Sequence, residues 1–416
     1  MTKKSDAPAI RFKGFSDAWE QRKFDEVFDC TVPNNTLSRA ELSYDEGTVL
    51  NVHYGDVLIK YGSVLDVQKD DIPRIPHRCR EDFNGALLQD GDVIIADTAE
   101  DETTGKACEI GNLQGSAIVS GLHTMVCRPR NRMALGYLGY YLNSNAYHHQ
   151  LLPLMQGIKV LSLSRSNIQK TSVSYPIAVK EQQLIAYYFS QLDNLITLHQ
   201  RKFEKLTNVK KSMLEKMFPQ NGSSYPEIRF KGFTDPWEQR KLGDIADIVG
   251  GGTPSTGNQS YWDGDIDWYA PAEIADQIYA NSSQKKITGL GYENSSAKML
   301  PPGTVLFTSR AGIGKTAILT RKGCTNQGFQ SIVPHRGELD SYFIFSRTEE
   351  LKRYGELVGA GSTFVEVSGK QMAVMELMMP PTMREQQTIG GFFQQLDHLI
   401  TLHQRQLFFI QPRIFL

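Results

Sequence analysis

The chain has 416 residues, and its 45 basic and 46 acidic residues give a net charge of −1 at pH 7. This balance excludes a protein that holds nucleic acid by bulk positive charge; such a partner would need locally placed basic residues and other subunits to share its phosphates. No apolar run reaches the roughly 18 residues of a membrane span. The five scattered cysteines form no Cys-x-x-Cys pair, so we expect free thiols and a cytoplasmic protein.

The chain opens on a motif that it later repeats. Residues 10–15 (IRFKGF) and 19–23 (WEQRK) return at 228–233 and 237–241, a shift of 228 − 10 = 218. A repeat of this length indicates two large domains that begin with the same motif, and each domain is long enough to bury its own core.

The first body, residues 10–180, is predicted to be an α+β domain built on a mixed β-sheet. Its short β-type runs are separated by turns that contain glycine, and helical segments are few. A turn and buried strand at 91–96 match those at 303–308, although most of the residues differ. The two halves therefore share the order of their structural elements but differ in sequence. This suits a protein that recognises two different targets at a fixed separation.

Charged residues of the first body are candidate contacts. Lys60, Lys69 and Arg74 belong to a basic cluster that aspartates interrupt, which favours either phosphate contact or an ordinary charged surface. The turn at 97–106 is acidic and ends on Lys106. It is three residues longer than the equivalent turn of the second body, residues 309–315. A solvated acidic face is favoured there over contact with cytosine, and the two bodies cannot present the same surface.

A long connector helix is predicted over residues 181–218. It holds no proline or glycine, and apolar residues recur at helical spacing. Residues 191–201 (QLDNLITLHQR) return at 395–405 with one change, a shift of 395 − 191 = 204, so the second body is shorter by 218 − 204 = 14 residues. The second half of this helix is basic, which is compatible with contact to a DNA backbone, contact to an acidic partner or exposure to solvent. A linker is predicted after the helix, at 219–227.

The second body, residues 228–384, contains a glycine-rich basic loop at 309–316 (SRAGIGKT). It lacks the first glycine of a nucleotide-binding loop, because Ser309 stands at that position. Arg310 and Lys315 suit a nucleic-acid phosphate or base edge, and an ordinary basic turn is the alternative.

The second connector helix is predicted at 385–416 with a shortened, aberrant end. Thr382 and Glu385 form a capping-box pattern, and the repeat holds until Arg405, after which Pro412 is predicted to break the helix. Two such helices would pair antiparallel with a body at each end, unless each helix packs only on its own domain.

No catalytic motif is found in the sequence. It has no Walker A loop, no His-Glu-x-x-His, no Gly-x-Ser-x-Gly and no Asn/Asp-Pro-Pro-aromatic motif for amino-methyl transfer. Its histidines lack the spacing of metal ligands. We therefore expect no enzyme activity and no metal site.

Several short motifs, in this order, carry a family resemblance: WEQRKLGD at 237–244, GGTPS at 251–255, YWxGDIxW at 261–268, TNQG at 325–328 and EQQ at 385–387. With the two QLDxLITLHQR helices, they resemble the specificity subunit of type I restriction-modification enzymes over nearly the whole chain. Each motif alone is weak, but their order is specific.

The resemblance implies two target-recognition domains, each reading one half of an asymmetric, split double-stranded DNA site, with the paired helices setting the gap. It implies as partners two modification (methyltransferase) subunits, which use S-adenosylmethionine on adenine, and restriction subunits, which use ATP and Mg. This chain would bind no cofactor itself. A two-domain scaffold that binds no DNA, or a truncated inactive specificity allele, are the alternatives.

Within that picture we expect the DNA contacts to come from loops of both bodies. The candidate residues are Lys60, Lys69, Arg74, Lys106, Lys159, Thr253, Arg310, Lys315, Gln327, Gln330 and Thr363.

Overall fold

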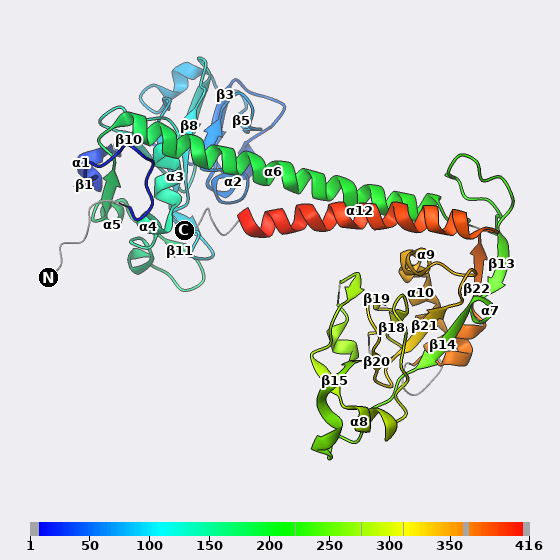
Figure 1. The fold of residues 1–416 in the computed structure, drawn as a ribbon. Coiled ribbons are helices and arrows are strands. Elements are labelled where there is room, and N and C mark those ends of the chain that lie inside the picture. Colours follow the sequence, from blue (N-terminus) through cyan, green and yellow to red (C-terminus); the bar gives the residue numbers. More distant parts are fainter. Residues whose placement is uncertain (1–7, 221, 276, 311, 361–365, 411–416) are drawn as a thin grey trace. The chain divides into compact units, whose positions relative to one another are not determined.

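The computed structural model describes residues 8–220, 222–275, 277–310, 312–360 and 366–410 (Figure 1). It divides into two units, one of residues 1–199 with 406–416 and the other of residues 200–405. None of the helices in the described ranges is long and apolar enough to cross a membrane.

In each unit the repeated opening motif forms a strand that pairs with the last strand of the body. β1 (Glu20–Lys23) runs antiparallel to β12 (Ser172–Tyr175), with Glu20 opposite Tyr175. β13 (Glu238–Lys241) runs antiparallel to β22 (Glu376–Met379) in the same register, with Glu238 opposite Met379. The two frames therefore have the same hydrogen-bonded geometry, as the repeat predicts.

Each unit contains a five-stranded sheet with the same topology. The strand order is β2-β10-β6-β8-β4 in the first unit and β14-β21-β18-β19-β16 in the second. All neighbours are antiparallel except the last pair of each sheet, which is parallel, so the predicted mixed sheet is confirmed. The strands of the first sheet are β2 (Phe28–Asp29), β10 (Thr124–Pro129), β6 (Val93–Ala96), β8 (Ala107–Gly111) and β4 (Val64–Asp66). Those of the second are β14 (Ala246–Gly250), β21 (Gln330–Pro334), β18 (Val305–Phe307), β19 (Thr316–Leu319) and β16 (Tyr279–Ala280).

A three-stranded sheet also recurs, and its middle strand is antiparallel to one neighbour and parallel to the other. Its strands are β5 (Arg74–Ile75), β3 (Val49–Val52) and β9 (Ala117–Ser120) in the first unit, and β17 (Lys285–Ile287), β15 (Trp262–Tyr269) and β20 (Cys324–Thr325) in the second. The first unit adds the pair β11 (Leu161–Ser162) and β7 (Thr98–Ala99).

Short helices cover the sheets. In the first unit they are α1 (Phe24–Val27), α2 (Tyr54–Ile59), α3 (Tyr137–Asn143), α4 (Asn145–His148) and α5 (Arg165–Ile168). In the second they are α7 (Leu242–Ile245), α8 (Gly289–Glu293), α9 (Ser341–Ser346), α10 (Thr348–Gly359) and α11 (Gly369–Ala373). The matched strands β6 and β18 are fully buried in the cores of their units, because both of their faces are covered.

The two predicted connector helices are present as α6 (Val179–Lys216) and α12 (Met383–Ile410). Within the second unit they run antiparallel: the Phe218 ring, just after α6, stacks on Phe393 of α12 with centroids 5.9 Å apart, and Lys210 pairs with Asp397 further along. Pro412, the predicted helix breaker, lies outside the described residues.

The predicted capping box of α12 forms only in part. The Thr382 hydroxyl oxygen accepts the backbone N–H of Glu385 at 3.3 Å. The Glu385 carboxylate does not return to the cap; it binds Arg229 and the indole N–H of Trp237. A tertiary ion pair therefore replaces the local bond that the sequence pattern suggests.

Candidate nucleic-acid interface

Thr308 fixes the loop between β18 and β19. Its hydroxyl donates to the carbonyl of Gly312 at 2.7 Å and accepts the N–H of Lys315 at 3.0 Å. Gly312 and Gly314 have φ values of 77° and 92°, a left-handed backbone that glycine adopts without steric cost. The backbone of residues 312–315 is therefore held in one shape, and the side chains of Arg310 and Lys315 are exposed.

Arg310 and Lys315 line a groove of about 710 Å³ within the second unit. The charged lining comprises four cations and two carboxylates: Lys210, Arg310, Lys315, Lys352, Glu349 and Glu356. Arg310 also pairs with Glu366 at 2.9 Å, with side chains 47% and 35% exposed. Because an ion pair so exposed is weak, the guanidinium can exchange this carboxylate for a phosphate or a base edge.

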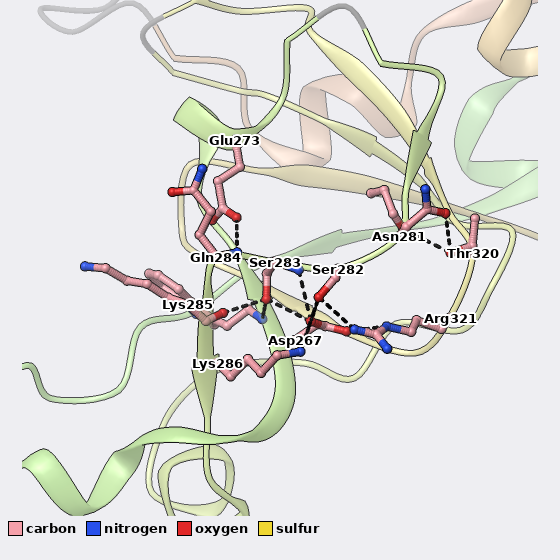
Figure 2. Close-up of polar contacts among 12 residues, drawn as sticks. Asp267, Glu273, Asn281, Ser282, Ser283, Gln284, Lys285, Lys286, Thr320 and Arg321 are labelled. Carbon is pink, nitrogen blue, oxygen red and sulfur yellow. Dashed lines mark hydrogen bonds and ion pairs between the residues drawn. The ribbon is translucent and has the colours of Figure 1, made fainter. Parts of the chain in front are cut away.

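Asp267 of β15 organises a second basic cluster in this unit (Figure 2). Its carboxylate accepts Lys286 Nζ at 2.6 Å and Arg321 Nε at 2.6 Å, and Figure 2 shows it between these two side chains. The N–H and hydroxyl of Ser283 donate to it as well, each at 3.0 Å. The Asp267 side chain is 3% exposed, whereas Lys286 and Arg321 are 32% and 52% exposed.

Asp267 remains ionised because these donors surround it. Burial opposes its charge, but the hydrogen bonds from Lys286, Ser283 and Arg321 outweigh burial and lower its pKa to about 2. One buried carboxylate thus holds two cations at the surface. Lys285 lies beside them, with its amine 5.9 Å from the centre of the Trp262 ring. The cluster has surplus positive charge and fixed donors, which suits a phosphate backbone.

The aromatic residues near this cluster pack mainly in the core. Trp268 is buried, and its ring meets Trp262 edge-on at 5.1 Å. Thr253, in the preceding glycine-rich stretch, donates its hydroxyl to the side-chain carbonyl of Gln327, so the structure brings these two candidates together. Gln330 is half-buried on β21, where its backbone pairs with Gly250.

In the first unit, Tyr44 gathers three basic residues. Lys60 Nζ lies 4.6 Å and the Arg39 guanidinium 5.1 Å from the centre of its ring, and Arg74 Nη1 donates to its carbonyl at 3.2 Å. Lys60 also pairs with Asp71 at 2.8 Å. Two predicted residues, Lys60 and Arg74, therefore share one cluster with Arg39, which sequence reasoning missed.

Two further basic candidates of this body, Lys69 and Lys106, differ in exposure. Lys69 is 80% exposed and pairs with Asp66 at 3.0 Å. The Lys106 amine instead donates to the backbone carbonyl of Leu58 at 2.9 Å, and burial lowers its pKa. Contact with DNA through Lys106 would require this side chain to leave a satisfied, partly buried position.

Lys159 lies on an exposed turn that the bridge between Gln156 and Ser162 closes. Ile158, at the tip of this turn, is 99% exposed, and Val160 is 51% exposed. Thr363, the equivalent candidate in the second body, lies outside the described residues.

Comparison with known protein families identifies the family of this chain. The family described as "Type I restriction modification DNA specificity domain" matches residues 16–208 and 234–408, one match for each half of the repeat. The chain belongs to this family of type I restriction-modification specificity subunits.

Relatives of the specificity family include proteins from archaea and bacteria. The type I restriction enzyme MjaIX specificity subunit of Methanocaldococcus jannaschii is 36% identical over 173 residues, which cover 41% of this chain and 40% of that protein. A second protein of that organism, named as a type I restriction enzyme MjaX specificity subunit, is 24% identical over 93% of this chain and 89% of its own length. The crystal structure of the S subunit from M. genitalium has the same fold, with a TM-score of 0.62, 11% identity and coverage of 98% and 96%.

For this specificity subunit, sequence reasoning missed the Asp267 cluster and Arg39. A signal for the first was present: Asp267 stands between Ile266 and Trp268 in a strand, and a buried carboxylate requires charged or hydrogen-bonding partners. No local signal marks Arg39, whose place beside Tyr44 depends on the tertiary fold. Across the described ranges, no group of three or more His, Cys, Asp or Glu side chains is placed to hold a metal ion.

Proposed function

We propose that this chain is a non-catalytic specificity subunit that recognises a bipartite, asymmetric double-stranded DNA site. Each body reads one half-site through its loops. Two modification subunits, using S-adenosylmethionine, methylate adenine at that site, and restriction subunits, using ATP and Mg, cleave DNA.

One observation carries this proposal: the two bodies have the same strand order and the same frame but unlike charged surfaces. The second presents the loop with Arg310 and Lys315 and the Asp267 cluster, whereas the first presents the Tyr44 cluster and an acidic turn. A shared scaffold with different loops suits the reading of two different sequences, because base edges are distinguished by the donors and acceptors that reach them.

The near-neutral net charge also fits this role. Because phosphate neutralisation dominates affinity for DNA, a chain with charge −1 gains strong binding only with subunits that supply further cations. We expect weak DNA binding by the isolated chain and much tighter binding by its complex with modification subunits.

The test is a genome-wide map of N6-methyladenine in cells that express this chain with its neighbouring modification subunit, against cells that lack the chain. The expected result is a new two-part motif with a fixed gap. If the complex assembles and binds DNA no better than the modification subunit alone, a protein scaffold replaces this proposal. Assembly and DNA binding without new methylation would indicate an inactive specificity allele.

A further inference from the structure

Asp97 and Ser309 occupy equivalent backbone positions in the two bodies. The N–H of Asp97, just after β6, donates to the carbonyl of His123 at 3.1 Å, and the N–H of Ser309, just after β18, donates to that of Gly328 at 2.8 Å. His123 is therefore the counterpart of Gly328, which follows the predicted DNA contact Gln327. At this place the first body has an imidazole and a carboxylate, whereas the second has a glycine and a fully buried serine.

His123 has a backbone conformation that residues other than glycine rarely adopt. It lies in the short turn between β9 and β10, and its φ of 53° falls in the left-handed region. The Cβ atom makes this region costly, and glycine would occupy it without strain. Strained conformations of this kind concentrate at functional sites, so the His123 side chain is a candidate for a role that glycine cannot fill.

Two oxygen atoms face one nitrogen of the His123 ring. Nδ1 lies 3.4 Å from Oδ1 of Asp97 and 3.4 Å from Oγ1 of Thr98. The Thr98 hydroxyl donates its own hydrogen to Asp97 at 2.8 Å, so both oxygens face the ring as acceptors. Nδ1 is therefore the nitrogen that carries a proton.

The other side of the ring is fixed by Tyr54, at the start of α2. The two rings meet edge to face, with centroids 5.4 Å apart and planes at 77°. The His123 side chain is nevertheless 48% exposed, and none of the described residues forms a hydrogen bond with its Nε2. The ring is thus oriented by its neighbours and keeps one nitrogen for a ligand.

The helix α2 also links His123 to the Tyr44 cluster. Asp56 of α2 pairs with Arg39 at 2.6 Å, and a helix of six residues is only about 9 Å long. Cations that can hold phosphates therefore lie near a ring that can reach a base. This is the arrangement that sequence recognition needs, because phosphate contacts position a protein on DNA and base contacts give specificity.

Given the proposed DNA recognition, we propose that His123 is a base-reading residue of the first body and that Asp97 and Thr98 are positioning residues for its ring. With Nδ1 protonated, the neutral imidazole presents Nε2 as an acceptor. In the major groove, the donors for such an acceptor are the amino groups of adenine and cytosine. His123 accepts a hydrogen bond from one of these amino groups in the half-site that the first body reads.

The experiment uses the complex of the full chain with its modification subunit and compares the methylation motifs of the unchanged and variant complexes. His123→Gly removes the ring and keeps the turn, because glycine adopts the left-handed conformation readily. We expect it to relax one base pair of one half-site and to leave the other half-site unchanged. Asp97→Ala should relax the same base pair less, and Asp97→Asn, which keeps an acceptor for Nδ1–H, should restore part of the lost discrimination.

A second measurement tests the hydrogen bond itself. In one duplex, the adenine or cytosine of the relaxed base pair lacks its amino group. The unchanged complex should bind this duplex about tenfold more weakly than the natural one, which corresponds to the loss of one hydrogen bond. The His123→Gly complex should bind both duplexes equally.

The matched control is His77→Gly. His77 is another exposed histidine of the first body with a left-handed backbone, at a φ of 56°, and its loss should leave both half-sites unchanged. A normal motif in His123→Gly, or equal relaxation by His77→Gly, overturns the role of His123 and leaves the proposed function standing. Absence of a two-part motif in the unchanged complex overturns both. Urea unfolding of each variant establishes that it is folded.

Discussion

Glu385 accepts two hydrogen bonds from the guanidinium of Arg229, 2.7 and 2.9 Å long, although the two residues are 156 positions apart. The side chains are 1% and 13% exposed. Arg11 and Glu181 form the same pair in the first unit, with distances of 2.6 and 2.7 Å. In each copy a nearly buried ion pair therefore ties the opening motif to the start of the long helix.

Glu385→Gln should destabilise the second unit strongly. The change leaves the Arg229 guanidinium without a counterion in a largely buried position, and breaking such a pair costs about 3 kcal/mol. Urea unfolding followed by tryptophan fluorescence measures it, because Trp237 donates to Glu385. Glu338→Gln is the matched control: its pair with Arg240 is 46% and 36% exposed, so the loss should stay below about 1 kcal/mol. Equal losses in the two variants would contradict the prediction.

Arg310→Ala should relax recognition at one base of one half-site. If its guanidinium makes two hydrogen bonds to a guanine, the loss of discrimination is about 1–3 kcal/mol. The measurement compares the methylation motif of the variant complex with that of the unchanged complex. Lys352→Ala, on the same groove, removes equal charge and should leave the motif unchanged. An unaltered motif in Arg310→Ala would remove this residue from base recognition.

Arg321→Ala should weaken DNA binding about equally for all sequences. Arg321 is held by Asp267 at the surface, where it suits phosphate contact. Loss of one phosphate contact lowers the slope of log affinity against log salt by about 1. Titrations of the complex at several salt concentrations measure the slope, and Arg336→Ala serves as a charge-matched control. A loss confined to one DNA sequence would indicate a base contact instead.

Glu109→Gln should stabilise the first unit at alkaline pH. Glu109 is 1% exposed on β8, and burial raises its pKa from the ordinary 4.5 to about 7, although the N–H of Gly139 donates to it at 2.8 Å. Because the folded state binds this proton more tightly than the unfolded chain, stability falls as pH rises from 4.5 through 7.

At pH 8, glutamine removes this cost of about 3 kcal/mol, while it can still accept the Gly139 hydrogen bond. Urea unfolding at pH 5 and pH 8 should therefore show a gain from the substitution that is much larger at pH 8. A difference between the two proteins that does not change with pH would show that Glu109 does not titrate in this range.

The frame of the fold was predictable because its signals are local or repeated. The helical spacing of apolar residues indicated α6, and the turn and strand at 91–96 matched those at 303–308 as β6 and β18. The shared place of Arg310 and Lys315 on one exposed loop was predictable for the same reason, and their contact with DNA stays a prediction. The predicted capping bond from the Glu385 carboxylate was wrong. This carboxylate binds Arg229, which is distant in the sequence, and not the backbone at the start of the helix.

The sequence by itself determined that two domains with the same order of elements are joined by long helices. Repeated motifs and the periodicity of apolar residues can be recognised without tertiary contacts. Only the tertiary structure decided which charges lie together. Strand pairing brings Arg321 to Asp267 across 54 positions (321 − 267), and chain folding places Arg39, Lys60 and Arg74 around Tyr44. The tertiary structure also gave equivalent phenylalanines different burial. Phe393 is buried against Phe218, which follows α6, whereas Phe189 is only half-buried. Burial depends on the neighbours that the fold supplies, and residue identity alone does not contain them.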